Sequence, residues 1–178
     1  MPSGSATNPG DVVTTMSGQT VEILNTDAEG RLILADALSY ASKHYDPEFM
    51  VDFATLTGAC VVTFGHITSA ILGNNKGLID NIQKSSKNTG ELVWELPLWD
   101  EYCDQVKSDI SDVKNLGSPG QAGTIAGAAF LKAFVGKDIP WTHFDVAGTA
   151  WGVENRSYIQ KNGASGQVVR LILDLIGA

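Results

Sequence analysis

The chain has 178 residues, of which 43% are apolar and 18% charged, so it can bury a core and is unlike a disordered chain. Its formal net charge is −8. A surface of that sign repels phosphate backbones, so we expect no nucleic-acid partner.

Two features bear on the compartment. Cys60 and Cys103 form no CxxC pair, which favours a reduced, cytoplasmic protein, with a single disulfide as the alternative.

Residues 53–73 hold no Asp, Glu, Lys or Arg, and a run of about 20 such residues could span a membrane. That run is interrupted by Thr, Ser, His and Gly, so we expect no membrane contact and predict two buried strands, or a strand and a turn, instead. The opening residues lack the apolar core of a signal peptide.

The first half of the chain alternates between strand and helix patterns. Residues 1–10 predict a loop, residues 19–24 a strand, and residues 31–43 a helix with one apolar face. Thr26 and Glu29 match a capping box, which predicts that this helix begins near Asp27. Residues 49–56 form an apolar run typical of a strand buried on both faces, and residues 69–73 predict another strand.

The second half continues the alternation. Residues 78–89 predict a helix closed by Gly90, residues 94–99 an extended segment, and residues 100–106 a short helix. A Gly-rich loop over residues 115–123 precedes an apolar helix at 124–135, a strand at 141–146 and a last helix at 167–176. The four tryptophans favour core or interface positions. The order of elements predicts an α/β fold, with αβα layers around a mostly buried mixed sheet, in a single domain over residues 1–178.

Asp27 and Glu29 carry the first chemical signal, because they follow a predicted strand where a helix begins. Ligands in open α/β sheets sit beyond the carboxyl ends of strands, and two carboxylates in one turn can converge on a divalent ion. Arg31 follows, where its fixed cation could face a developing oxyanion. The alternative reading is structural, because acids in a first helical turn are favoured by the helix dipole.

The octapeptide Asn-Thr-Asp-Ala-Glu-Gly-Arg-Leu at residues 25–32 resembles the signature of the leucine aminopeptidase family (peptidase family M17). Further stretches resemble the same family, and the similarity runs from Met1 to about Leu175. They are Met-Pro-Ser-Gly at 1–4, Gly-Gln-Thr at 18–20, Ala-Thr-Leu-Thr-Gly-Ala at 54–59, Leu-Pro-Leu at 96–98, His-Phe-Asp-Val-Ala-Gly at 143–148 and Gly-Ala-Ser-Gly at 163–166.

The resemblance implies a zinc-peptidase-like catalytic domain that releases leucine-like N-terminal residues from peptides, using a water activated by two divalent ions, manganese or zinc. Glu29 would bridge the ions and Asp27 would bind one of them. Arg31 would be catalytic, holding the tetrahedral intermediate or a bicarbonate ion that serves as base. The implied substrate contacts are Thr55, Leu56, Gly58, Leu116, Ala147 and Ala150. The family also implies a homo-oligomer, a hexamer.

The family's remaining metal ligands, a lysine and two aspartates, together with a second, catalytic lysine and an N-terminal domain, precede the Met-Pro-Ser-Gly stretch. We therefore expect this chain to be the C-terminal part of the catalytic domain and inactive alone. Other residues could replace the missing ligands only if they gathered at one site, and none forms the missing set; they are Asp11, Asp52, His66, His143 and Asp145. Asp52 and Asp145 are expected to be structural. The alternative function is a non-catalytic oligomerisation or binding module derived from the family.

Overall fold

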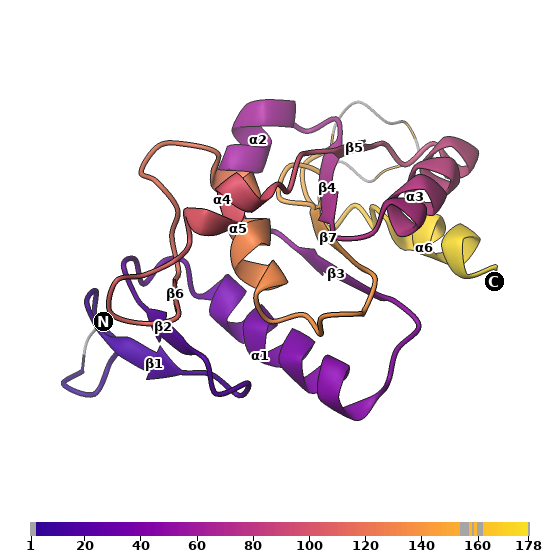
Figure 1. Ribbon diagram of the computed structural model, residues 1–178. Helices are drawn as coiled ribbons and strands as arrows, with labels where there is room; N and C mark the ends of the chain where they lie inside the picture. The colour runs from indigo at the N-terminus through magenta and orange to yellow at the C-terminus, as the bar shows by residue number, and fades with distance from the viewer. Residues whose placement is uncertain (1–2, 154–156, 158, 160–161, 178) are drawn as a thin grey trace. The chain divides into compact units, whose positions relative to one another are not determined.

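The computed structural model describes residues 3–153, 157, 159 and 162–177 (Figure 1). Met1 and Pro2 of the family-like opening stretch therefore lie outside the described residues. The chain divides into two compact units, which are described separately. Unit 1 comprises Met1–Glu48 and Leu98–Ile139, and unit 2 comprises Phe49–Pro97 and Pro140–Ala178. The expectation of one domain over residues 1–178 stays a prediction.

Unit 1 combines a small sheet with three helices. Strand β1 (Val12–Thr14) pairs antiparallel with β2 (Thr20–Glu22), and β2 pairs parallel with β6 (Val113–Lys114). The helices are α1 (Gly30–His44), α4 (Asp100–Asp104) and α5 (Gly123–Lys132). Buried alanines and Phe130 on α5 and a buried Ala35 and Leu38 on α1 supply apolar contact surface. Strands β1 and β6 were not predicted, because three-residue and two-residue strands carry too little pattern to detect.

Unit 2 is built on a four-stranded mixed sheet in the order β3-β7-β4-β5. Strand β3 (Met50–Ala54) runs parallel to β7 (Trp141–Asp145), β7 antiparallel to β4 (Ser69–Gly73), and β4 parallel to β5 (Val93–Glu95). Its helices are α2 (Gly58–Phe64), α3 (Lys76–Thr89) and α6 (Val169–Ile176). The predicted α/β class and mixed sheet are confirmed.

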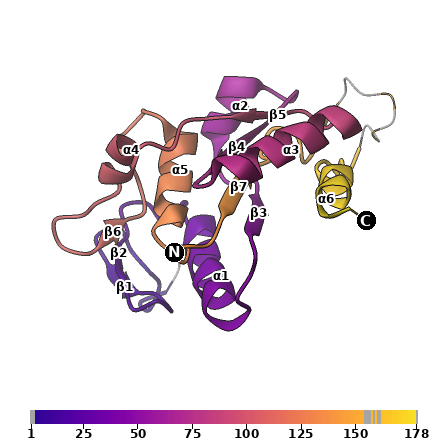
Figure 2. The ribbon, with the colours of Figure 1, turned by 45° about the vertical axis from the view of Figure 1, so that its right-hand side comes forward.

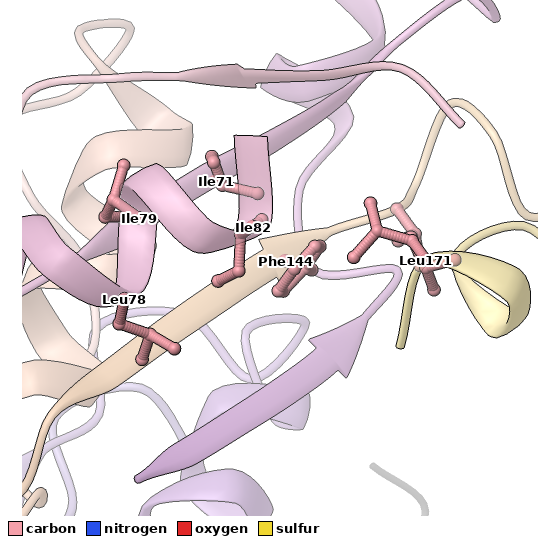
Figure 3. Packing of buried hydrophobic residues seen from close by; sticks show 8 residues of the cluster. Ile71, Leu78, Ile79, Ile82, Phe144 and Leu171 are labelled. Atoms are coloured by element: carbon pink, nitrogen blue, oxygen red, sulfur yellow. The ribbon is translucent and has the colours of Figure 1, made fainter. Parts of the chain in front are cut away.

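Helices α3 and α6 lie side by side on one face of this sheet, as both views of the ribbon show (Figures 1 and 2). Figure 3 shows the core between them and the strands, where Ile79 and Ile82 of α3 and Leu171 of α6 meet Ile71 and Phe144. All five side chains are at most 2% exposed. Burial of such side chains contributes roughly 1.5–3 kcal/mol each, which fixes the strands whose ends carry candidate site residues.

One local prediction is incomplete and another is wrong. Residues 53–73 contain the end of β3 and all of β4, as the two-strand alternative expected, but the segment between them holds the unpredicted helix α2, whose N-cap Thr57 accepts the backbone N–H of Cys60. The capping box at Thr26 and Glu29 is also not formed: Glu29 has helical φ and ψ of −75° and −35° and makes no side-chain cap bond. Helix α1 begins at Gly30, because Asn25 instead closes the preceding turn by accepting the N–H groups of Asp27 (2.9 Å) and Ala28 (3.3 Å).

The tryptophans divide unequally between the interior and the surface. Trp141 is fully buried, whereas Trp94, Trp99 and Trp151 are each more than 60% exposed. Among the described residues, no helix is both long and apolar enough to cross a bilayer.

Candidate active site

The predicted carboxylate pair lies on the turn that leads from β2 into α1 in unit 1. Asp27 and Glu29 are both exposed, and Glu29 is the residue just before the helix. The backbone carbonyl of Glu29 accepts the N–H groups of Leu32 (2.9 Å) and Ile33 (3.3 Å), so this residue is tied to the first helical turn. Solvent-facing oxygens two residues apart on an anchored turn are available to a cation or a polar ligand.

Arg31 differs from the two acids because it is buried, with 6% of its surface exposed. Its Nη1 donates to the backbone carbonyl of Asn115 at 2.9 Å. A guanidinium held in this way keeps its charge in a fixed position beside the turn, which suits stabilisation of negative charge.

Asn115 organises the candidate residues of unit 1, and no sequence pattern singled it out. Its Oδ1 accepts the N–H groups of Leu24 (2.8 Å) and Asn25 (3.3 Å), and its Nδ2 donates to the carbonyl of Asn25 (2.7 Å). Its backbone N–H donates to the backbone carbonyl oxygen of Glu22 at 3.0 Å. One fully buried residue, through its side-chain amide and its backbone, therefore connects the end of β2, the turn that carries Asp27, and Arg31. Leu116, a predicted substrate contact, is the next residue and is half-buried.

The remaining predicted contacts belong to unit 2. Thr55, Leu56 and Gly58 lie on the link from β3 to α2, with Thr55 and Gly58 exposed and Leu56 half-buried. Ala147 and Ala150 follow β7 and are half-buried. Since Ala54 and Asp145 are paired in the parallel register of β3 and β7, both segments leave the sheet at the same edge. The fold thus brings Thr55, Leu56 and Ala147 to one end of unit 2.

The loop after β7 is held closely against the turn that follows α2. A Cβ at Gly148 would lie 2.1 Å from the carbonyl oxygen of Gly65, so only glycine fits this contact. His66 Nδ1 forms a hydrogen bond with the carbonyl oxygen of Gly148 at 2.7 Å. The conformation of residues 147–150 is therefore restricted by packing as well as by the chain itself.

The alternative ligands are engaged elsewhere. Asp52, 8% exposed, accepts Trp141 Nε1 at 2.7 Å and pairs with His143 Nδ1 at 2.6 Å. Asp145 is bonded to loop donors, and His66 to Gly148. Within the part of the chain that the structure describes, no three His, Cys, Asp or Glu side chains gather in a group that could hold a metal ion. The expectation that Asp52 and Asp145 are structural agrees with these bonds.

The fold defines the class of this protein. It is an α/β protein whose candidate polar residues lie on loops at the ends of strands. The chain belongs to the cytosol aminopeptidase family, because the model of that family's catalytic domain matches residues 1–173.

Relatives agree with this assignment. The chain is 56% identical over 176 residues to a "Probable cytosol aminopeptidase" of Geobacter sp. (strain M21), covering 99% of this chain and 35% of that relative. It is 53% identical to proteins of the same name from Chlorobaculum parvum, covering 99% of this chain and 34% of the relative, and from Stutzerimonas stutzeri, covering 97% and 33%. The chain spans about a third of the length of these relatives.

Proposed function

We propose that this chain forms part of the catalytic site of a cytoplasmic, metal-dependent aminopeptidase that releases leucine-like N-terminal residues from peptides. The observation that carries the proposal is the octapeptide at residues 25–32, whose acids Asp27 and Glu29 are exposed on an anchored turn while Arg31 is buried beside them. The relatives named as probable cytosol aminopeptidases support the same activity.

The proposal assigns Asp27 and Glu29 as carboxylate ligands of two divalent ions, manganese or zinc. Carboxylate oxygens suit both metals. Two carboxylates do not complete a site, and the described residues supply no third ligand, so the rest of the ligand set would come from outside them. When bound, the ions would supply an activated water.

The roles proposed for the chain's own residues follow from their surroundings. Arg31, held by Asn115, would stabilise negative charge that develops on the scissile carbonyl oxygen or hold a bicarbonate ion there. In unit 2, Leu56, Ala147, Ala150 and the neighbouring Thr55 and Gly58 are proposed to contact the peptide substrate. Leu116 of unit 1 is proposed as a further substrate contact. Half-buried alanines and leucines make an apolar surface, which discriminates by only about 1–3 kcal/mol per methylene, so broad specificity is expected. Assembly as a homo-oligomer, a hexamer, belongs to the same proposal.

A chimera tests the proposal. The matching third of the Geobacter relative is replaced by this chain, and release of p-nitroaniline from leucine p-nitroanilide is measured with manganese present. We expect the chimera to be active and Asp27→Asn or Glu29→Gln to lower kcat/KM at least about a thousandfold, as expected for several kcal/mol of transition-state stabilisation.

Glu48→Gln is the matched control, because Glu48 is an exposed acid of the same unit outside the octapeptide. It should leave kcat/KM unchanged. A folded chimera without activity, beside an active unmodified relative, would refute the proposal. If that chimera still assembled into oligomers, the non-catalytic module would be the better reading.

A further inference from the structure

Asp145, the last residue of β7, holds together the two loops at the end of unit 2. It is fully buried. Its Oδ1 accepts the backbone N–H groups of Leu56 and Ala147, both at 3.2 Å, and its Oδ2 accepts the hydroxyl of Thr57 at 2.6 Å. A buried carboxylate is tolerated only when donors replace its lost hydration, and three donors do so here.

Two of these three donors come from a segment that is distant in sequence. Leu56 and Thr57 lie 89 and 88 positions from Asp145, on the link from β3 to α2. The hydroxyl of Thr57 also accepts the N–H of Cys60 at 3.2 Å, which makes Thr57 the cap of α2. The carboxylate is therefore connected to the start of a helix and to the link before it.

The same edge of the sheet is closed by backbone bonds. The N–H of Val146 donates to the carbonyl of Ala54 at 2.9 Å, which continues the β3–β7 pairing by one step. Beyond this bond the two backbones no longer pair as strands, and the Asp145 side chain makes the next connections between them. The position of Leu56 relative to Ala147 therefore depends on one carboxylate that bonds both N–H groups.

We propose that Asp145 is a positioning residue that sets the relative placement of the peptide-binding segments 55–58 and 147. The inference rests on the proposed function, since it concerns the binding of the peptide substrate. Asp145 is not a catalytic residue, because it is fully buried and its carboxylate is bonded to Leu56, Thr57 and Ala147. Its removal should weaken substrate binding more than it slows the chemical step.

Asp52 offers a matched control. It is also a buried aspartate on the same sheet, and its carboxylate is bonded to Trp141 and His143 of the neighbouring strand. Loss of either carboxylate removes a buried, hydrogen-bonded charge. Only Asp145 is bonded to the loops, so only its loss should affect them specifically.

The first experiment measures amide hydrogen exchange in the 178-residue chain, with rates normalised to amides of α3. Asp145→Ala should raise exchange at Leu56 and Ala147 at least about tenfold, the equivalent of one lost hydrogen bond to a charged group, whereas Asp52→Ala should not. Unchanged protection at both amides in Asp145→Ala would overturn the inference, and this result does not depend on any enzymatic activity.

The second experiment measures leucine p-nitroanilide kinetics in the chimera. Thr57→Val removes the hydroxyl that donates to Oδ2 and accepts the N–H of Cys60, and it leaves the Asp145 carboxylate in place, so it keeps the inference testable if Asp145→Ala does not fold. We expect KM to rise about fivefold to tenfold with kcat within about twofold, and Thr57→Ser, which retains the hydroxyl, to restore KM.

A fall in kcat with KM unchanged, or an equal rise in KM for Asp52→Ala, would overturn the positioning role. Failure of the proposed function looks different, because the unmutated chimera would then be inactive. Failure of the positioning role leaves that chimera active and its KM insensitive to Asp145 and Thr57.

Discussion

Single buried polar side chains organise both groups of candidate site residues. In unit 1, the side chain of Asn115 bonds the turn that carries Asp27 and Glu29, and its backbone carbonyl accepts the guanidinium of Arg31. In unit 2, Asp145 bonds the segments that carry Leu56 and Ala147. Asn115 lies 84 positions from Arg31 and Asp145 lies 89 positions from Leu56, so the chain is held at both places by contacts that local propensity cannot supply.

The Cys60 thiol shows how burial next to Asp145 changes the pKa of a neighbouring group. The thiol is fully buried, and burial, followed by the negative charge of Asp145, raises its pKa from 9.0 to about 11. Its Sγ donates to the carbonyl of Asp145 at 3.4 Å. A protonated and buried thiol is a poor nucleophile.

We therefore predict that iodoacetamide at pH 8.5 labels Cys103, which is half-buried, and leaves Cys60 unmodified until the chain is unfolded. Mass spectrometry of tryptic peptides measures this. Because the folded pKa is the higher one, the stability contributed by Cys60 is present below pH 9 and is lost as pH rises to 11, at up to about 1.4 kcal/mol per pH unit. Cys60→Ala should lack this alkaline loss in urea titrations. Equal labelling of both thiols in the folded chain would contradict the prediction.

At the scale of elements, α6 begins without a cap of its own. Its N-cap residue Val168 has a φ of 70° and supplies no side-chain bond. The carboxylate of Glu91, 2% exposed and located just before β5, replaces it by accepting the N–H of Leu171 at 2.9 Å and by pairing with Arg170 at 3.4 Å. A negative charge at a helix N-terminus is favoured by the helix dipole.

We predict that Glu91→Ala lowers the free energy of unfolding by about 2 kcal/mol, because it leaves a buried N–H without an acceptor. Urea denaturation followed by circular dichroism measures this. Glu95→Ala in the same unit is the control, since its ion pair with the exposed Lys76 is open to solvent and should contribute less than about 1 kcal/mol. Equal effects of the two substitutions would show that the Glu91 contact does not stabilise α6.

At the scale of the whole molecule, the chain matches about a third of each relative and contains two of the carboxylates that the family's signature implies. The described residues gather no three potential metal ligands at one place. Metal affinity depends on the full number of ligands and on their geometry, so two exposed acids form a weak site at most.

We therefore predict that the isolated 178-residue chain binds neither manganese nor zinc tightly in calorimetric titrations and does not hydrolyse leucine p-nitroanilide. Addition of the chelator EDTA should leave its thermal unfolding temperature unchanged, because no bound ion contributes to the fold. Two tight sites, both lost in Glu29→Ala, would contradict this.

Local sequence patterns were enough to predict the family and most of the larger elements. The octapeptide identified the family, and α3, β4 and β7 lie close to their predicted positions because continuous apolar runs, helical periodicity and Gly90 are local signals. Helix α2 was missed because an apolar run of this length does not distinguish helix from strand.

Only the folded chain shows the strand order β3-β7-β4-β5 and the hydrogen-bond partners of Asn115 and Asp145. It also shows that Asn25, and not the Thr26 and Glu29 pair, closes the turn before α1. For Asn115 and Asp145 the cause is the same. A buried amide or carboxylate must find partners to replace water, and those partners are brought near only when segments distant in sequence have packed together.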